Sequence, residues 1–146
     1  MNSGYGYSVW YVPNDYLSIM DEYDIQHIPH VTIATNLASI TQAEHVYLSL
    51  PTIANIIITS TSPELFPSMY ANDPLKALGW FVEFDPQSNV PSIRHTPHIS
   101  TLYFTSVQPP YPPLRQCAPI QGYMRCNKFI ADTRSGDPSQ WCLVFD

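Results

Sequence analysis

HIPHVT, residues 27–32, recurs in similar form as HTPHIS at residues 95–100. Both copies read histidine, any residue, proline, histidine, a β-branched aliphatic residue and a hydroxyl residue. The copies begin 68 residues apart, at positions 27 and 95, and they contain four of the five histidines of the chain. Five histidines placed at random would rarely form this pattern. The repeat therefore gives the strongest indication of fold and function in this sequence.

Each copy is predicted to start a strand, because a proline without an N–H belongs at the beginning or edge of one. Side chains alternate between the two faces of a strand, so His30 and Thr32 share one face and Val31 points to the other. In the second copy, His98 and Ser100 share a face in the same way. Two such strands related by a pseudo-twofold axis would bring two imidazole–hydroxyl pairs together across one cleft.

This arrangement of side chains suits phosphodiester chemistry. Histidine has an unperturbed pKa of about 6.5, so one imidazole can accept a proton from the attacking oxygen while another donates one to the leaving oxygen. We expect His30 and His98 to fill these roles. The hydroxyls of Thr32 and Ser100 can donate hydrogen bonds to phosphate oxygens in the transition state. Neither a metal nor a cofactor is required.

The motif His-aliphatic-Thr/Ser, present at residues 30–32 and 98–100, resembles the motif of the 2H phosphoesterase superfamily. That superfamily includes RNA ligase-like proteins, 2′,3′-cyclic phosphodiesterases, and viral enzymes that cut 2′,5′-oligoadenylates or cyclic oligonucleotide signals. The resemblance implies an α+β, bilobal fold with two pseudo-symmetric antiparallel sheets around a central cleft and a few helices. It covers the layout of residues 1–146 as a single domain, but only the two short motifs closely.

The resemblance also implies an activity and a setting. The expected enzyme is a metal-independent phosphodiesterase acting on a small nucleotide: a cyclic oligonucleotide or dinucleotide signal, a 2′,5′-linked oligonucleotide, or a 2′,3′-cyclic phosphate. The short chain is similar to compact phage and viral members, which implies a role against nucleotide-based antiviral immunity in the host cytoplasm. The second half departs from the superfamily, because a proline-rich run at residues 108–113 follows its motif where a helix is expected. The alternative function is a nucleotide-binding module that sequesters its ligand without turnover.

Aromatic and basic residues are the candidates for substrate binding, since stacking on a base is worth ~1–3 kcal/mol. Most aromatic residues of a β-rich domain lie in the core or in cross-strand pairs, so we expect only one or two at the site. Arg94 directly precedes the second motif and can reach a phosphate, with a solvated surface position as the alternative. The resulting candidates are Tyr7, Trp10, Tyr11, Arg94 and Tyr103, with Trp80 and Trp141 as further aromatic residues that could stack a base.

His27 and His95 stand three residues before the catalytic candidates, out of register with the expected cleft face. We expect them to support the site from a strand end or a loop. The sharpest alternative is a zinc site made of all four motif histidines, since imidazole is a good zinc ligand. Side chains at positions i and i+3 of an extended chain diverge, however, which disfavours that site.

The composition limits the partners. Net charge is −6, and residues 1–75 contain no Lys or Arg, so the overall field will not attract long nucleic acids. No segment approaches the ~20 apolar residues of a membrane span, and the N-terminus does not read as a signal peptide. The three cysteines match no metal or redox spacing and predict free thiols in a reducing cytoplasm. A bond between Cys126 and Cys142 across a hairpin is not expected.

Hydrophobic periodicity and turn residues predict a strand-rich chain with two or three helices. One helix follows a cap at Asn14 or Asp15. A second covers about residues 41–50, with a capping box formed by Thr41 and Glu44 or by Ser39 and Gln42. The predicted strands cover residues 5–12, 28–34, 54–61, 78–84, 97–104, 122–131 and 141–145, the last two as a hairpin.

Overall fold

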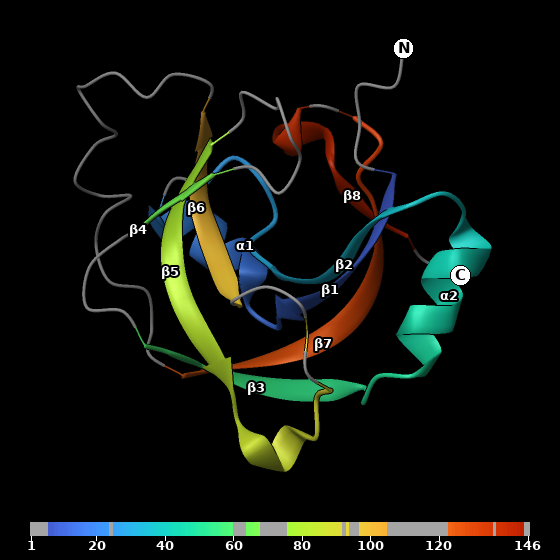
Figure 1. Ribbon diagram of the computed structural model, residues 1–146. Coiled ribbons are helices and arrows are strands. Elements are labelled where there is room, and N and C mark those ends of the chain that lie inside the picture. Colours follow the sequence, from blue (N-terminus) through green and yellow to red (C-terminus); the bar gives the residue numbers. More distant parts are fainter. Residues whose placement is uncertain are drawn as a thin grey trace.

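The structure is a computed structural model that describes residues 6–23, 25–59, 64–67, 76–91, 93, 97–104, 123–135 and 137–144. It is an α+β protein with few helices and many strands (Figure 1). In chain order its elements are β1 (Tyr7–Pro13), α1 (Tyr16–Tyr23), β2 (Val31–Leu37), α2 (Ile40–Leu48), β3 (Ile53–Ile58), β4 (Glu64–Pro67), β5 (Lys76–Phe84), η1 (Pro86–Ser88), β6 (His98–Phe104), β7 (Tyr123–Asp132), η3 (Pro138–Gln140) and β8 (Cys142–Val144).

The strands form a closed antiparallel barrel. Neighbouring strands follow the order β1-β2-β6-β5-β3-β7, and pairing of β1 with β7 closes the ring (Figure 1). β4 pairs with β5 and β8 pairs with β7, so these two strands lie at the edges of the ring. The sequence-based expectation of an α+β fold is confirmed. The described strands belong to one continuous sheet and do not divide into two separate sheets.

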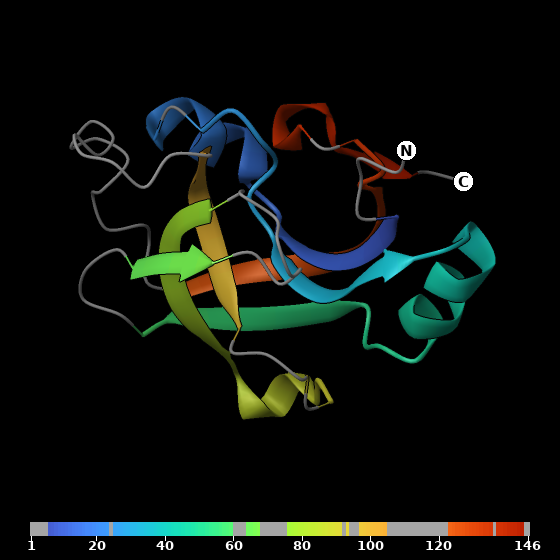
Figure 2. The same ribbon diagram turned by 45° about the horizontal axis from the view of Figure 1, so that its top comes forward.

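The barrel interior holds the main hydrophobic core. Because side chains alternate along β1, Val9 and Tyr11 point inward, whereas Trp10 and Val12 belong to a second cluster on the outside. Both helices contribute to the interior, and Ile19 of α1 is one of the buried residues. Figure 2 shows the segment that leads into β2 passing between α1 and the η3–β8 segment. The outer cluster lies on this side, because it contains Trp141 between η3 and β8.

Helix α2 is fixed at both ends by side chains. Ser39 is the N-cap: its hydroxyl accepts a hydrogen bond from the backbone N–H of Gln42, and Gln42 Oε1 accepts one from the Ala38 N–H. The second of the two predicted capping boxes is therefore the one that forms. At the other end Lys128 Nζ donates to the carbonyls of Tyr47, in the last turn, and of Leu50, just after the helix.

Most predicted elements occur close to their expected positions, with two informative differences. β2 begins at Val31, later than expected, because the residues before it form local side-chain contacts and no ladder. The strands predicted from the sequence leave out residues 64–67, yet these residues form β4. β4 is an edge strand, where the missing N–H of Pro67 is tolerated. The hairpin of β7 and β8 is confirmed, and the run at residues 108–113 lies outside the described residues.

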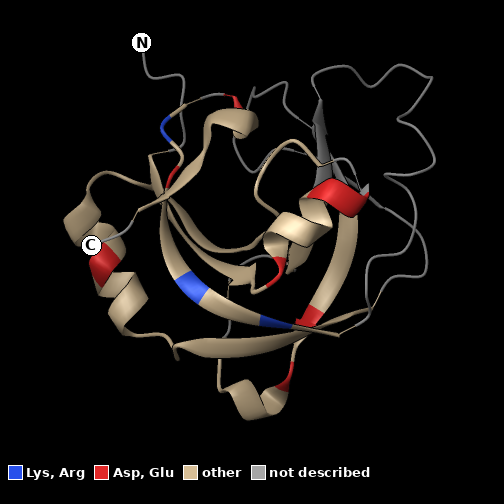
Figure 3. Ribbon diagram, turned by 180° about the vertical axis from the view of Figure 1, so that it is seen from behind, with Lys and Arg blue, Asp and Glu red and all other residues tan. Residues whose placement is uncertain are grey.

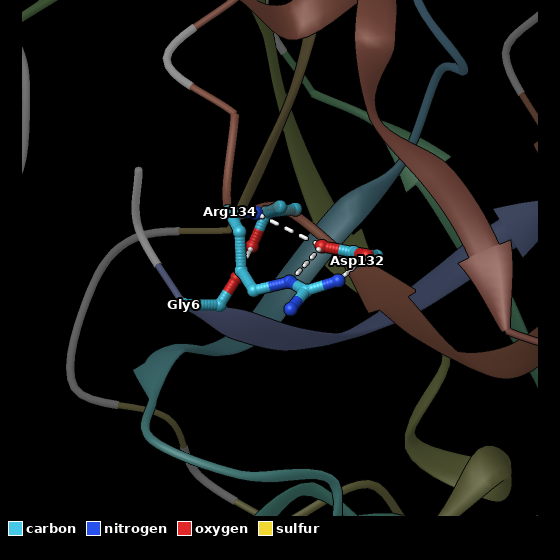
Figure 4. A network of polar contacts seen from close by, with 4 residues as sticks. Gly6, Asp132 and Arg134 are labelled. Atoms are coloured by element: carbon cyan, nitrogen blue, oxygen red, sulfur yellow. Dashed lines mark hydrogen bonds and ion pairs between the residues drawn. The ribbon is translucent and has the colours of Figure 1, made fainter. Parts of the chain in front are cut away.

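A polar network joins the N-terminal end of β1 to the C-terminal end of β7 (Figure 4). The Thr133 hydroxyl donates to the Gly6 carbonyl and lies 2.7 Å from the Ser8 hydroxyl. Beside it the Arg134 guanidinium donates two hydrogen bonds to the Asp132 carboxylate, and these hydrogen bonds lower the pKa of that carboxyl. These contacts hold the rim of the barrel next to the outer cluster.

Few residues of the described ribbon are charged (Figure 3). Two basic side chains there have structural partners. Lys128 donates a hydrogen bond to a carbonyl of α2, and Arg134 forms an ion pair with Asp132. Cys126 and Cys142 are both free, as expected, and Cys142 pairs in register with Asp132. No helix in the described part of the chain is long and apolar enough to cross a membrane.

Candidate active site

The two repeated motifs meet in the middle of the barrel wall. β2 and β6 are antiparallel neighbours, and the residues that pair are Val31 and Ile99, the central residues of the two His-x-Thr/Ser triplets. Antiparallel pairing about this point sets His30 opposite Ser100. It likewise sets Thr32 of the first triplet opposite His98 of the second. The local arrangement therefore has the pseudo-twofold relation that the repeat predicts.

The functional side chains and the apolar side chains of the motifs occupy opposite faces of the wall. Val31 and Ile99 are fully buried in the barrel interior. By alternation, the histidines and hydroxyl residues on either side of them face outward, toward the cluster that contains Trp10 and Trp141. The predicted division between an apolar underside and a polar face is thus present.

Gly79 allows the second motif to approach the neighbouring strand closely. It pairs with Ser100 at an irregularity of the β5–β6 ladder. A Cβ at this position would collide with the Ile99 carbonyl oxygen and would lie 2.9 Å from Ser100 Cα. Only glycine fits such an approach without moving the backbone of the motif.

His30 is enclosed by aromatic side chains. Its ring stacks on Trp10, with centroids 3.6 Å apart and an interplanar angle of 11°. Trp141 lies across the same ring at 6.1 Å and across Trp10 at 6.0 Å. Only 4% of the His30 surface is exposed, so the imidazole lies beneath the outer cluster rather than in the open position that the sequence suggested.

The hydrogen bond of His30 defines its tautomer. Nδ1 lies 2.7 Å from the Ile28 carbonyl oxygen. Because a carbonyl only accepts hydrogen bonds, Nδ1 carries the proton of the neutral ring, and Nε2 carries the lone pair. This is the form in which an imidazole can accept a proton from a substrate.

Burial keeps this ring neutral. Desolvation, with smaller contributions from nearby His27 and His98, lowers the pKa of His30 to about 3. Desolvation likewise lowers the pKa of His27 to about 4, partly offset by its hydrogen bond to Ser100. Both rings are therefore unprotonated near neutral pH.

His27 belongs to the site, although it lies outside the His-x-Thr/Ser triplets. It precedes β2 in a bend, and its Nε2 lies 2.7 Å from the Ser100 carbonyl oxygen. Its ring is 6.2 Å from that of His30, nearly perpendicular to it. This is the supporting position expected from the sequence, and the contact crosses from the first motif to the second. Its counterpart His95 lies outside the described residues.

The four catalytic candidates differ in accessibility. Ser100, like His30, is buried, whereas Thr32 and His98 are half-buried. The sequence suggested that all four would open on a cleft. Thr32 and His98 are therefore more accessible than His30 and Ser100.

The predicted substrate-binding residues separate into different places. Trp10 stacks on His30 and so lies at the site. Tyr11 points into the barrel, where burial raises the pKa of its hydroxyl to about 12 and that hydroxyl donates to the Pro51 carbonyl. Tyr7 packs against the interior cluster and contacts Arg134. Tyr103 of β6 pairs with Ala77 of β5, and Arg94 lies outside the described residues.

The position of Tyr11 corrects the expectation that it binds substrate. Adjacent residues of a strand face opposite sides, so Trp10 and Tyr11 could not both lie beside His30. Alternation alone could have chosen between them. Trp141, by contrast, reaches His30 through the β7–β8 hairpin, and no local sequence signal indicates that contact.

Among the described residues, no group of three or more His, Cys, Asp or Glu side chains is arranged to hold a metal ion. Comparisons of the chain with protein-family models, with curated proteins and with solved structures found no match. The functional interpretation therefore rests on the motif pair and its geometry.

Proposed function

We propose that the protein is a metal-independent phosphodiesterase of the 2H phosphoesterase type that cleaves a small nucleotide. The observation that carries this proposal is the pairing of Val31 with Ile99, which brings two His-x-Thr/Ser triplets together about a pseudo-twofold axis. Neither triplet alone offers both an acid and a base. The proposal includes the pseudo-symmetric, bilobal arrangement of that superfamily, which the pairing of the two motif strands supports.

In this proposal the two imidazoles have different roles. His30 is the base, because its Nδ1–H is engaged with the Ile28 carbonyl and its Nε2 therefore carries the lone pair. Its Nε2 takes the proton of the attacking oxygen, which forms the new P–O bond. His98, half-buried, is the acid and gives a proton to the oxygen that leaves as the old P–O bond breaks. The net result is one bond formed, one broken and one proton moved between the imidazoles.

The hydroxyls of Thr32 and Ser100 complete the proposed site. Each lies two residues after its histidine, on the same face of the strand. Donors fixed at such positions stabilise the charge that develops on the non-bridging phosphate oxygens. The attacking oxygen is a ribose 2′-OH for a 3′,5′ linkage and water for a cyclic phosphate. With net charge −6, a short substrate such as a cyclic dinucleotide or 2′,5′-linked oligonucleotide is favoured over long RNA.

The second candidate function is a nucleotide-binding module that sequesters its ligand. The burial of His30 and Ser100 favours this alternative, because a reacting substrate has to reach both. The presence of both hydroxyls and both histidines favours catalysis. In the catalytic case, the substrate enters from the more open side, where Thr32 and His98 lie.

The two functions are separated by incubating the purified protein with 2′,3′-cyclic nucleotides, 2′,5′-linked oligoadenylates and cyclic dinucleotides. Chromatography detects turnover, and calorimetry on the same panel detects binding. We expect products with the wild-type protein and with His45→Ala, whose histidine is exposed on α2, and none with His98→Ala. Binding without products would support sequestration, and the absence of both from the whole panel would contradict both functions.

A further inference from the structure

Among the described residues, the ladder between β2 and β6 is the shortest in the barrel. Its described register contains the single pair Val31–Ile99. By comparison, β1 and β7 pair at seven positions and β5 and β6 at six. The seam between β2 and β6 joins the two motifs and therefore sets the distance between the proposed acid and base, and its described ladder is short.

His27 crosses this seam. Its Nε2 lies 2.7 Å from the Ser100 carbonyl oxygen, and the hydrogen bond is buried. Because the carbonyl can only accept, Nε2–H is the donor. The side chain reaches from the bend before β2 to the backbone of β6, and so supplies a bond that the strand ladder does not provide there. At 4% exposure, water does not compete readily for this bond.

We propose that His27 is a positioning residue that fixes the second motif against the first by binding the Ser100 carbonyl. Its catalytic consequence rests on the proposed phosphodiesterase function. Holding the backbone of Ser100 also holds the Ser100 hydroxyl and the neighbouring His98 relative to His30. Displacements of ~1 Å between reacting groups can cost ~100-fold in rate, so such a bond has a large effect.

The position of His27 gives it a second influence. Its ring lies 6.2 Å from His30. The titratable groups that act on His30 are His27 and His98, and both lower its pKa, after the dominant effect of burial. Loss of the His27 imidazole removes one of the contributions that lower the pKa of His30, whether or not the new side chain can bind the Ser100 carbonyl.

Two substitutions separate these effects. His27→Gln keeps an N–H donor near the position of Nε2, and His27→Leu keeps bulk without a donor. We expect His27→Leu to lower kcat on the order of 10- to 100-fold with little change in KM, and His27→Gln to restore most of kcat. The acidic limb of the kcat/KM profile should move to higher pH in both variants. His45→Gln is the matched control and should change neither quantity.

The bond across the seam can also be tested without any substrate. Hydrogen exchange at the backbone amides of β2 and β6 should become faster in His27→Leu and recover in His27→Gln, while the β1–β7 amides stay protected. This measurement distinguishes the two proposals: if the wild type has no turnover, the proposed function fails, and exchange still decides the role of His27.

Two results would overturn the role of His27. One is His27→Leu with wild-type kcat and wild-type exchange at the seam. The other is a folded His27→Gln that restores neither. Should His27→Leu fail to fold, His27→Asn replaces it, because the asparagine amide is one methylene shorter than that of glutamine and falls short of the Ser100 carbonyl.

Discussion

His30 and His98 occupy the same place in two copies of one motif, yet their surroundings differ. His30 stacks on Trp10, is crossed by Trp141 and is 4% exposed. His98 begins β6 and is half-buried. The difference comes from strands outside the repeat, because β1 provides Trp10 and the β7–β8 hairpin provides Trp141.

This asymmetry shows how a symmetric motif pair can support an asymmetric reaction. Acid–base catalysis requires one imidazole without a proton and one with it. Two identical environments would give both rings the same pKa. Enclosing one of them in an apolar cluster lowers its pKa to about 3 and so assigns it the unprotonated role.

The largest expected effect comes from removing either histidine. His30→Ala and His98→Ala should each lower kcat by ~10²–10⁴-fold, because each removes one proton-transfer step. The double variant should be little worse than either single one, since the two groups act as a unit. Steady-state kinetics on the substrate identified by the panel measures this, with His45→Ala as the control. An active His30→Ala or His98→Ala enzyme would exclude the assignment.

His30→Ala and His98→Ala should also differ in their effect on the free energy of unfolding. His30→Ala leaves a hole between Trp10 and Trp141 and should lower the free energy of unfolding by about 2–4 kcal/mol, as for other buried large side chains. His98→Ala should cost less. Imidazole added to the assay should restore part of the turnover of His98→Ala, whose site is half-open, and none of the turnover of His30→Ala.

The hydroxyl residues form the next comparison. Thr32→Ala and Ser100→Ala should each lower kcat by ~10–1000-fold, by analogy with oxyanion-hole donors. Thr32 is half-buried, so Thr32→Ala should leave thermal stability nearly unchanged. Ser100 is buried, so Ser100→Ala should lower the free energy of unfolding by about 1 kcal/mol. Kinetics and urea denaturation of the same preparations measure both quantities. A collapse of stability in Thr32→Ala would place that side chain in the core.

The buried histidines predict acid lability. In the unfolded chain a histidine has a pKa of about 6.5, whereas burial lowers the pKa of His27 to about 4 and that of His30 to about 3. Between pH 6.5 and 4 the unfolded state binds protons that the folded state excludes. The contribution of the two rings to the free energy of unfolding is therefore fully present above pH 6.5. It falls as the pH is lowered, by up to ~1.4 kcal/mol per pH unit for each ring.

Urea unfolding at several pH values between 7.5 and 4.5 tests this expectation. His27→Gln removes one of the two rings and should reduce the pH dependence by about half. His45→Gln should leave it unchanged, because His45 is exposed on α2. A wild-type protein with constant stability across this range would show that the rings are hydrated and protonate freely.

The repeat and the local periodicity predicted much of what the described residues show. β1, α1, α2, β7 and the β7–β8 hairpin lie close to their expected positions, since each depends on nearby residues. The outward face of the motifs followed from strand alternation alone. The sequence predicted that His27 lies at a strand end or in a loop, and it lies in a bend before β2, but its contact with Ser100 was not predicted.

Long-range pairing explains what the sequence could not predict. Closure of the barrel depends on β1 pairing with β7, more than a hundred residues apart in the chain. No pattern within either strand specifies that partner. The burial of His30 has the same origin, because Trp141 reaches it only through β8. The repeated motif could be recognised in the sequence, but the enclosure that makes its two halves different could not.

The smallest expected effect is that of a chelator. The proposed acid–base catalysis by His30 and His98 uses imidazoles and hydroxyls alone, so turnover should be the same with and without EDTA. The zinc alternative would instead require His27, His30, His95 and His98 to act alike, as four neutral ligands, and would remove the asymmetry between the motifs. Complete loss of turnover in EDTA, with recovery on adding zinc, would support that alternative. In that case His27→Gln should also lose zinc, measured by metal analysis of the purified variant, whereas a positioning role for His27 predicts no bound zinc in either protein.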